Sequence, residues 1–183
     1  MSGVAGVAGQ AVRSWLVRGW VLVALVGVSG CHAHPEMVSA SVTGYNHTSA
    51  EIIRFSINGA GGPSIPPNQA GGEVCCGVLP VQWTSELRAF IEWDKDPKPY
   101  ESLERDQYGQ IVKEAAIRHT VGYSHHSATV EIPKYAEEVC ALQIHFFPCD
   151  QVRVSTTCHT PGHPNYPDKA YFHVKESTKC PVL

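Results

Sequence analysis

Charged residues are scarce in this 183-residue sequence, at 17%, against about 25% in an average soluble domain. Neither sign dominates, because 14 Lys and Arg residues face 17 Asp and Glu residues, for a formal net charge of -3. The sequence therefore lacks the basic surface that nucleic-acid binders present to phosphates. Hydrophobic residues reach 43%, with 4 Trp, 7 Tyr and 5 Phe. This content argues against disorder and for one domain with an apolar core.

The motifs of several enzyme classes are also missing. There is no Gly-x-Ser-x-Gly pentapeptide of a serine hydrolase and no Gly-x₄-Gly-Lys-Ser/Thr loop for a nucleotide phosphate. Gly59-Ala60-Gly61-Gly62 has glycines like those of a dinucleotide-binding loop, but no helix is expected after it. We therefore predict that the protein is not an enzyme, assign no catalytic residue and expect no cofactor.

A long apolar run is absent, but a short one lies near the N-terminus. Residues 20–28 are apolar, which is too few for a membrane-spanning helix of about 20 residues. Two bases, Arg13 and Arg18, precede this run, and the pattern predicts a secretory signal peptide with a helical segment. Val28-Ser29-Gly30-Cys31 resembles the lipobox of bacterial lipoproteins, in which the Cys is acylated and becomes the N-terminus. An ordinary signal peptide with a Cys at its cleavage site is the alternative.

The lipobox resemblance divides the chain into three parts. It implies a cleaved signal peptide at 1–30, a lipidated tether at 31–37 and a single β-rich domain at 38–183. The lipid on Cys31 is the one covalent group that we expect, and two or three acyl chains anchor a protein stably. His32, rather than Asp, follows Cys31. Similarity to enterobacterial sorting then implies the outer membrane, with the domain facing the periplasm.

Seven cysteines cannot all pair within one chain. With Cys31 lipidated, those left in the oxidising envelope predict up to three disulfides, formed by Cys75, Cys76, Cys140, Cys149, Cys158 and Cys180. The sequence does not fix the pairing. Neighbours on a strand point to opposite faces, so we expect Cys75 and Cys76 to have different partners. The rival interpretation is a metal site of Cys75, Cys76, Cys158, His159 and His163. The Cys-x₂₋₄-Cys spacing of zinc sites is missing, however, and we assign no metal.

Short alternating runs bounded by Gly, Pro and Asn predict seven strands, at 38–42, 52–57, 73–78, 87–93, 128–132, 140–147 and 151–156. In the sixth, apolar residues alternate with Gln143 and His145, which predicts one buried and one polar face. The pattern predicts a mainly β fold, an antiparallel β-sandwich with long Gly/Pro loops and stabilising disulfides. Residues 110–116 fit a helix or a strand. We expect the Pro- and His-rich tail from about 158 to be held by its two cysteines.

Five segments carry a family resemblance: Gly44–Thr48, Ile57–Gly62, Gly71–Pro80 with Trp83, Val130–Tyr135 and His145–Pro148. The chain resembles a family of proteobacterial lipoproteins of unknown function, and the double-cysteine segment is the most specific part of the likeness. Some members resemble immunity proteins against type VI secretion phospholipases. The resemblance implies a non-enzymatic binding module that neutralises such an effector at the membrane. The alternatives are a structural or assembly lipoprotein of the envelope and, third, a metal-binding or redox protein.

A module of this kind recognises its partner through loops on a rigid scaffold. We expect the loop 58–72 and the charged excursion 94–108 to contact the partner, although both also fit plain exposed connections. The candidate partner-binding residues are Tyr45, Asn58, Gly61, Gly62, Tyr100 and Tyr135, since tyrosines are frequent at interfaces. The expected partners are the membrane, through the lipid, and a protein that is a lipase effector or an envelope component. No nucleic acid is expected.

Overall fold

A computed structural model describes residues 35–135, 139–175 and 180. The predicted signal peptide with its helix, the lipidation site Cys31 and most of the tether lie outside these residues. None of the helices in the described part of the chain combines the length and the apolar character needed to cross a lipid bilayer.

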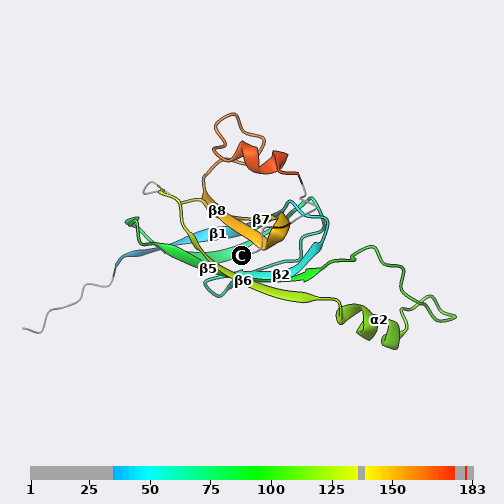
Figure 1. The fold of residues 1–183 in the computed structure, drawn as a ribbon. Helices are drawn as coiled ribbons and strands as arrows, with labels where there is room; N and C mark the ends of the chain where they lie inside the picture. The colour runs from blue at the N-terminus through cyan, green and yellow to red at the C-terminus, as the bar shows by residue number, and fades with distance from the viewer. Residues whose placement is uncertain (1–34, 136–138, 176–179, 181–183) are drawn as a thin grey trace, which may run out of the picture. The chain divides into compact units, whose positions relative to one another are not determined.

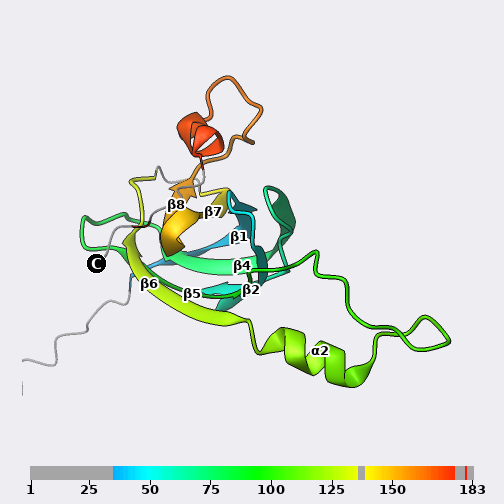
Figure 2. The same cartoon turned by 45° about the vertical axis from the view of Figure 1, so that its right-hand side comes forward.

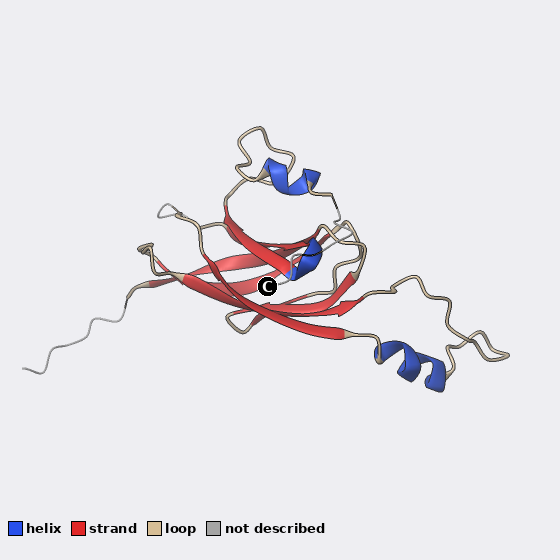
Figure 3. Ribbon diagram, viewed as in Figure 1, coloured by secondary structure: helices blue, strands red, loops and turns tan. Residues whose placement is uncertain are grey.

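Two four-stranded sheets pack against each other (Figures 1 and 3). The first has the strand order β4-β1-β7-β8 and the second has the order β3-β2-β5-β6. Neighbouring strands are antiparallel except β1 and β7, which run parallel. The strands are β1 (Met37–Asn46), β2 (Glu51–Ile57), β3 (Ala60–Gly62), β4 (Ala70–Pro80), β5 (Arg88–Asp96), β6 (Ser124–Glu131), β7 (Ala141–Phe147) and β8 (Gln151–Thr156). The helical segments are α2 (Lys113–Thr120), η1 (Pro148–Asp150) and η2 (Lys169–His173).

The hydrophobic core lies between the two sheets. Side chains alternate between the faces of a strand, so each sheet turns one apolar face to the other. The residues with almost no solvent contact come from both sheets and include Val42, Ile52, Ile57, Ile91, Leu142 and Ile144. This double layer is the rigid scaffold from which the connecting segments emerge.

The predicted β-sandwich is confirmed, and all seven predicted strands are present. One pair departs from the antiparallel expectation, because β7 runs parallel to β1. Between these two strands the chain passes through the second sheet twice, as β2–β3 and as β5–β6, with β4 of the first sheet in between. The loop expected at 58–72 is more ordered than predicted. It contains β3, and its Ile65 pairs with Ile52 and is fully buried. The ambiguous segment 110–116 leads into the helix α2.

The six cysteines of the domain form three disulfides, Cys75–Cys76, Cys140–Cys158 and Cys149–Cys180. The expectation that Cys75 and Cys76 have different partners is wrong. It assumed regular alternation along a strand. The pairing of β4 with β1 shifts register between Ala40 and Val42, opposite these two cysteines. A bulge of this kind breaks the alternation of the two faces.

Two of the disulfides hold the C-terminal segment 157–175, here named the strap. Cys140 precedes β7 and bonds to Cys158 near the start of the strap, whereas Cys149 follows β7 and bonds to Cys180 beyond its end. The prediction that two cysteines hold the tail is thus confirmed. The strap lies over the first sheet, on the side away from β5 and β6 (Figures 1 and 2). It buries Gln143 and His145, which the alternation of β7 placed on a polar face.

Candidate functional site

Residues 97–123, here named the arm, connect β5 to β6 and project beyond these strands (Figures 1 and 2). Lys95 of β5 pairs with Ser124 of β6, so the arm leaves and rejoins the sheet at one place. All residues of the arm are described, and Ala115 is its only buried residue. Local hydrogen bonds, rather than a core of its own, therefore fix the shape of the arm.

The tip of the arm is a tight turn built on Asp106. Its carboxylate oxygen Oδ1 accepts the backbone N–H groups of Tyr108 and Gln110, each at 2.9 Å. Aspartate favours turns because its short side chain can bond to the backbone two residues further on. Gly109 takes a positive φ of 78°, and its carbonyl accepts a hydrogen bond from Arg105 at 2.7 Å. The turn holds Tyr108 at the outer end of the arm, with 78% of its surface exposed.

The arm concentrates exposed apolar side chains. Eleven large hydrophobic residues are exposed in the described part of the chain, and six of them lie on the arm: Tyr100, Tyr108, Ile111, Ile117, Val121 and Tyr123. Ile117 and Val121 are four residues apart along α2 and its C-cap, so they share one face. Scattered hydrophobic residues are common on surfaces, whereas a concentration of them marks an interaction site. These six exposed side chains, gathered on one segment of the chain, are the candidate functional site.

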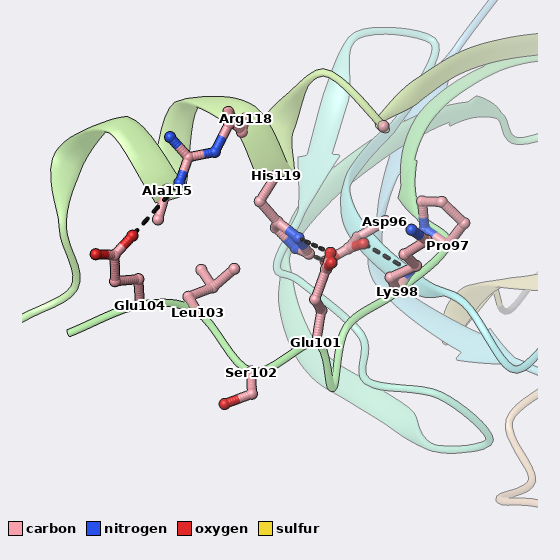
Figure 4. Close-up of a pocket in the computed structure, with 11 residues that line it drawn as sticks. Asp96, Pro97, Lys98, Glu101, Ser102, Leu103, Glu104, Ala115, Arg118 and His119 are labelled. Atoms are coloured by element: carbon pink, nitrogen blue, oxygen red, sulfur yellow. Dashed lines mark hydrogen bonds and ion pairs between the residues drawn. The ribbon is translucent and has the colours of Figure 1, made fainter.

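His119, at the end of α2, joins the returning part of the arm to its outgoing part and to the end of β5; this is the base of the arm (Figure 4). Its Nδ1 lies 2.9 Å from a carboxylate oxygen of Glu101, and its Nε2 lies 2.9 Å from a carboxylate oxygen of Asp96. Only the protonated imidazolium can donate from both nitrogens at once. The hydrogen bond to Glu101, followed by that to Asp96, raises the pKa of His119 above its ordinary value. The Asp96 carboxylate also accepts the N–H of Lys98 at 2.8 Å, which ties the first residues of the arm to β5.

A hollow of about 470 Å³ lies beside His119, between α2 and the outgoing part of the arm (Figure 4). Leu103 and Ala115 are among its apolar lining residues. Glu104 and Arg118 form an ion pair of 3.6 Å on its wall. The polar side chains that line this hollow therefore serve mainly to join the two segments of the arm.

Tyr100 is the one predicted partner-binding residue on the arm, and it is 79% exposed. Asn58, Gly61 and Gly62 lie together in the β2–β3 hairpin, away from the arm in sequence. Asn58 takes a positive φ of 48°, and its side chain accepts the N–H of Phe90 at 2.8 Å. A Cβ at Gly62 would overlap the ring of Phe55. These residues therefore have evident roles in shaping the hairpin.

Tyr45 and Tyr135, the other two predicted partner-binding residues, are buried. The hydroxyl of Tyr135 donates a hydrogen bond of 2.6 Å to the carbonyl of Pro80. The ring of Tyr45 stacks on His145 beneath the strap, with 4.9 Å between the ring centroids. Burial leaves little of either ring for contact with a protein.

The sequence interpretation missed most of the apolar residues of the arm. It ended the excursion at Tyr108 and singled out only Tyr100 within it. The spacing of Ile117 and Val121 could have indicated a helix with one apolar face. Their exposure could not be foreseen, because the same spacing ordinarily marks the face that packs on a core.

The rival metal site required free thiols at Cys75, Cys76 and Cys158, and all three are bound in disulfides. His159 and His163 instead stack on each other, with 4.1 Å between the ring centroids. Within residues 35–135, 139–175 and 180, no group of three or more His, Cys, Asp or Glu residues is arranged to hold a metal ion.

Comparison with known protein families gives a match over much of the domain. Residues 45–154, more than half of the chain, match the model of a family described as "Protein of unknown function (DUF3304)". The matched range runs from β1 to β8 and includes the arm, but it ends before the strap. Comparisons with curated proteins and with solved structures gave no match.

Proposed function

The chain belongs to the DUF3304 family, which is of unknown function, and on this premise we propose that it is an envelope-anchored, non-enzymatic protein-binding module. The exposed apolar surface of the arm carries this proposal. The turn at Asp106 holds the tip of the arm, and His119 holds its base. The arm is therefore already ordered before it binds, so little conformational entropy is lost on binding. Aromatic residues such as Tyr100 and Tyr108 are the side chains most enriched in the centres of interfaces.

The charges of the arm define the chemistry of the partner. Four Lys and Arg residues are matched by four acidic ones, namely Lys98, Arg105, Lys113 and Arg118, and Glu101, Glu104, Asp106 and Glu114. The further positive charge of protonated His119 is taken up by Glu101 and by Asp96 at the end of β5. Two of these acids and one of these bases are already paired within the arm. A strongly charged partner surface would gain little from such a balanced segment. The complementary surface is therefore an apolar cleft of a protein.

An enzyme that hydrolyses phospholipids has such a cleft, because it must accept acyl chains. We take the partner to be a phospholipase effector, in line with the family resemblance of the sequence, and the arm to occupy its cleft. A lipid on Cys31 would keep the inhibitor at the membrane that the effector attacks. Confinement to one surface raises the effective concentration of the inhibitor.

The proposal predicts that a phospholipase is encoded beside the gene for this protein, and inhibition of that enzyme tests it. We expect the wild-type protein to abolish lipid hydrolysis at equimolar concentration. Because Tyr108 and Val121 are 78% and 81% exposed, replacing both by Ala should leave the fold intact and weaken inhibition by at least about tenfold. The double variant Met37→Ala/Phe90→Ala, which removes exposed apolar side chains outside the arm, is the matched control and should inhibit normally.

Three results would contradict parts of the proposal. Equal inhibition by the wild type and by Tyr108→Ala/Val121→Ala would show that the arm is not the binding surface. Binding without inhibition would favour the alternative of an envelope assembly protein. If no such phospholipase is bound, the proposed class of partner is wrong.

A further inference from the structure

A second feature, independent of the arm, lies beneath the strap. Tyr45 of β1 and His145 of β7 stand opposite each other in the parallel register, on the face that the strap covers. Phe172 of η2 meets the rings of Tyr45 and His47 edge-on, with centroid distances of 5.5 and 4.9 Å. The strap thus closes a small aromatic cluster that is separate from the main core.

A chain of hydrogen bonds runs through this cluster. The hydroxyl of Tyr166 donates to the Oε1 atom of Gln143 at 2.7 Å and lies 3.1 Å from the Nε2 atom of His145. Its single proton is used by Gln143, so Nε2 of His145 must be the donor to Tyr166. His145 is neutral, and its Nδ1 then accepts a hydrogen bond from Nε2 of His47 at 2.9 Å.

This order of donors places a proton on Nε2 of His47, and burial lowers the pKa of His47, which favours its neutral ring. With its proton on Nε2, the neutral ring keeps a lone pair on Nδ1. No buried side-chain nitrogen or oxygen in the described part of the chain lacks a hydrogen-bond partner. The Nδ1 atom of His47 has no such partner there, so solvent reaches it. His47 therefore offers a preset acceptor to whatever lies outside it.

A hollow of about 460 Å³ opens between the strap, the end of β1 and the loop before β4. This volume falls within the range of about 300–1,000 Å³ found for small-molecule sites. Its lining includes Tyr45, His47, Asn68, Gln69, Phe172 and Val174. All these side chains are uncharged when His47 is neutral. Asn68 and Gln69 are exposed, and their backbone groups bond to Thr48 and Asn46, but no hydrogen bond of either side-chain amide is found within the described residues.

We propose that this hollow binds an uncharged saccharide. Sugar hydroxyls both donate and accept hydrogen bonds, which matches two free amides and the lone-pair acceptor of His47. The C–H face of a sugar ring is apolar and would pack on the exposed ring of Phe172. A charged ligand would find no opposite charge among the described residues that line the hollow.

Nuclear magnetic resonance titration of the disulfide-intact, ¹⁵N-labelled protein tests the inference. The probes are cellobiose and N,N′-diacetylchitobiose, which differ in whether acetamido groups accompany the hydroxyls. We expect saturable shifts of the side-chain amide signals of Asn68 and Gln69 with at least one probe. Phe172→Ala should weaken binding by about tenfold. Phe90→Ala is the matched control, because Phe90 is 46% exposed on the other sheet, against 39% for Phe172.

Phe172 also contacts the aromatic cluster, so Phe172→Ala alone does not separate a lost sugar contact from a loosened strap. A second variant separates the two. Asn68 has a positive φ of 56°, so Asn68→Gly removes the amide at a position that glycine accepts without strain. This variant should also weaken binding. The inference fails if neither disaccharide gives saturable shifts, or if both Phe172→Ala and Asn68→Gly bind the sugar as the wild type does.

Discussion

His145 shows how one buried residue couples this fold to pH. Removal from water, reinforced by nearby His47, lowers the pKa of His145 to about 3. The unfolded chain binds a proton at His145 near pH 6.5, whereas the folded chain does not. The unfolded state therefore gains protons as the pH falls below 6.5, and the folded state loses stability relative to it.

We predict that the free energy of unfolding falls by roughly 2 kcal/mol between pH 7 and pH 5 through His145 alone. Urea unfolding at the two pH values, with the disulfides intact, measures this change. The variant His145→Gln cannot titrate at this position, so its loss over the same interval should be smaller by that amount. An equal loss in the wild type and in His145→Gln would contradict the account of His145.

His119 responds to pH in the opposite direction. Its pKa is raised by the hydrogen bonds to Glu101 and Asp96. Its contribution is therefore fully present below the unfolded value of about 6.5 and is lost as the pH rises through the folded pKa. Deprotonation removes one of the two donors, and Glu101 or Asp96 then loses its partner.

At the scale of elements, the arm should open at its base when His119 loses its proton. We predict that proteolysis within 97–123 accelerates as the pH rises through the pKa of His119, while cleavage of the sheets does not. His119→Gln should be cleaved quickly at every pH, because it cannot donate to both carboxylates. Direct titration of the His119 ring signals should give a midpoint above about 6.5. A midpoint below this value would rule out the fastening role.

The two disulfides that hold the strap should stabilise the fold more than the disulfide between the neighbouring residues Cys75 and Cys76. Cys140–Cys158 and Cys149–Cys180 close loops with sequence separations of 18 and 31, whereas Cys75–Cys76 closes none of comparable length. Loop closure restricts the unfolded chain, so each strap disulfide should contribute about 3–4 kcal/mol. Paired replacement by Ser, followed by denaturant unfolding, measures each contribution. Cys75→Ser/Cys76→Ser is the control, and a loss as large as that of a strap pair would contradict this explanation.

The strands could be predicted from the sequence, whereas the segments that cover their outer faces could not. The alternation of Leu142, Ile144 and Phe146 correctly placed the core face of β7. The opposite face was expected to be polar, but Gln143 and His145 are covered by the strap. The strap has no periodic pattern, so only the tertiary structure shows what it covers. The disulfide partners of Cys75 and Cys76 were missed for a related reason, since a bulge depends on the neighbouring strand.

For the whole molecule, the two sheets present different outer faces. The strap covers the first sheet, whereas the second bears exposed Phe90, the ion pair of Asp94 with Arg54 and the hydrogen bond between Asp94 and His125. The arm continues from the second sheet, through β5 and β6. Partner binding by the arm and ligand binding beneath the strap therefore use different segments. Either proposal can fail without the other.

Hydrogen–deuterium exchange of the full chain, alone and with the phospholipase that the proposal predicts to be encoded beside its gene, tests the central claim most directly. Binding of a protein shields backbone amides from solvent, so exchange slows at the contacted segment. We predict slower exchange in peptides from 97–123, with exchange in β8 and the strap unchanged. Slower exchange confined to other segments, with the arm exchanging as in the free protein, would contradict it.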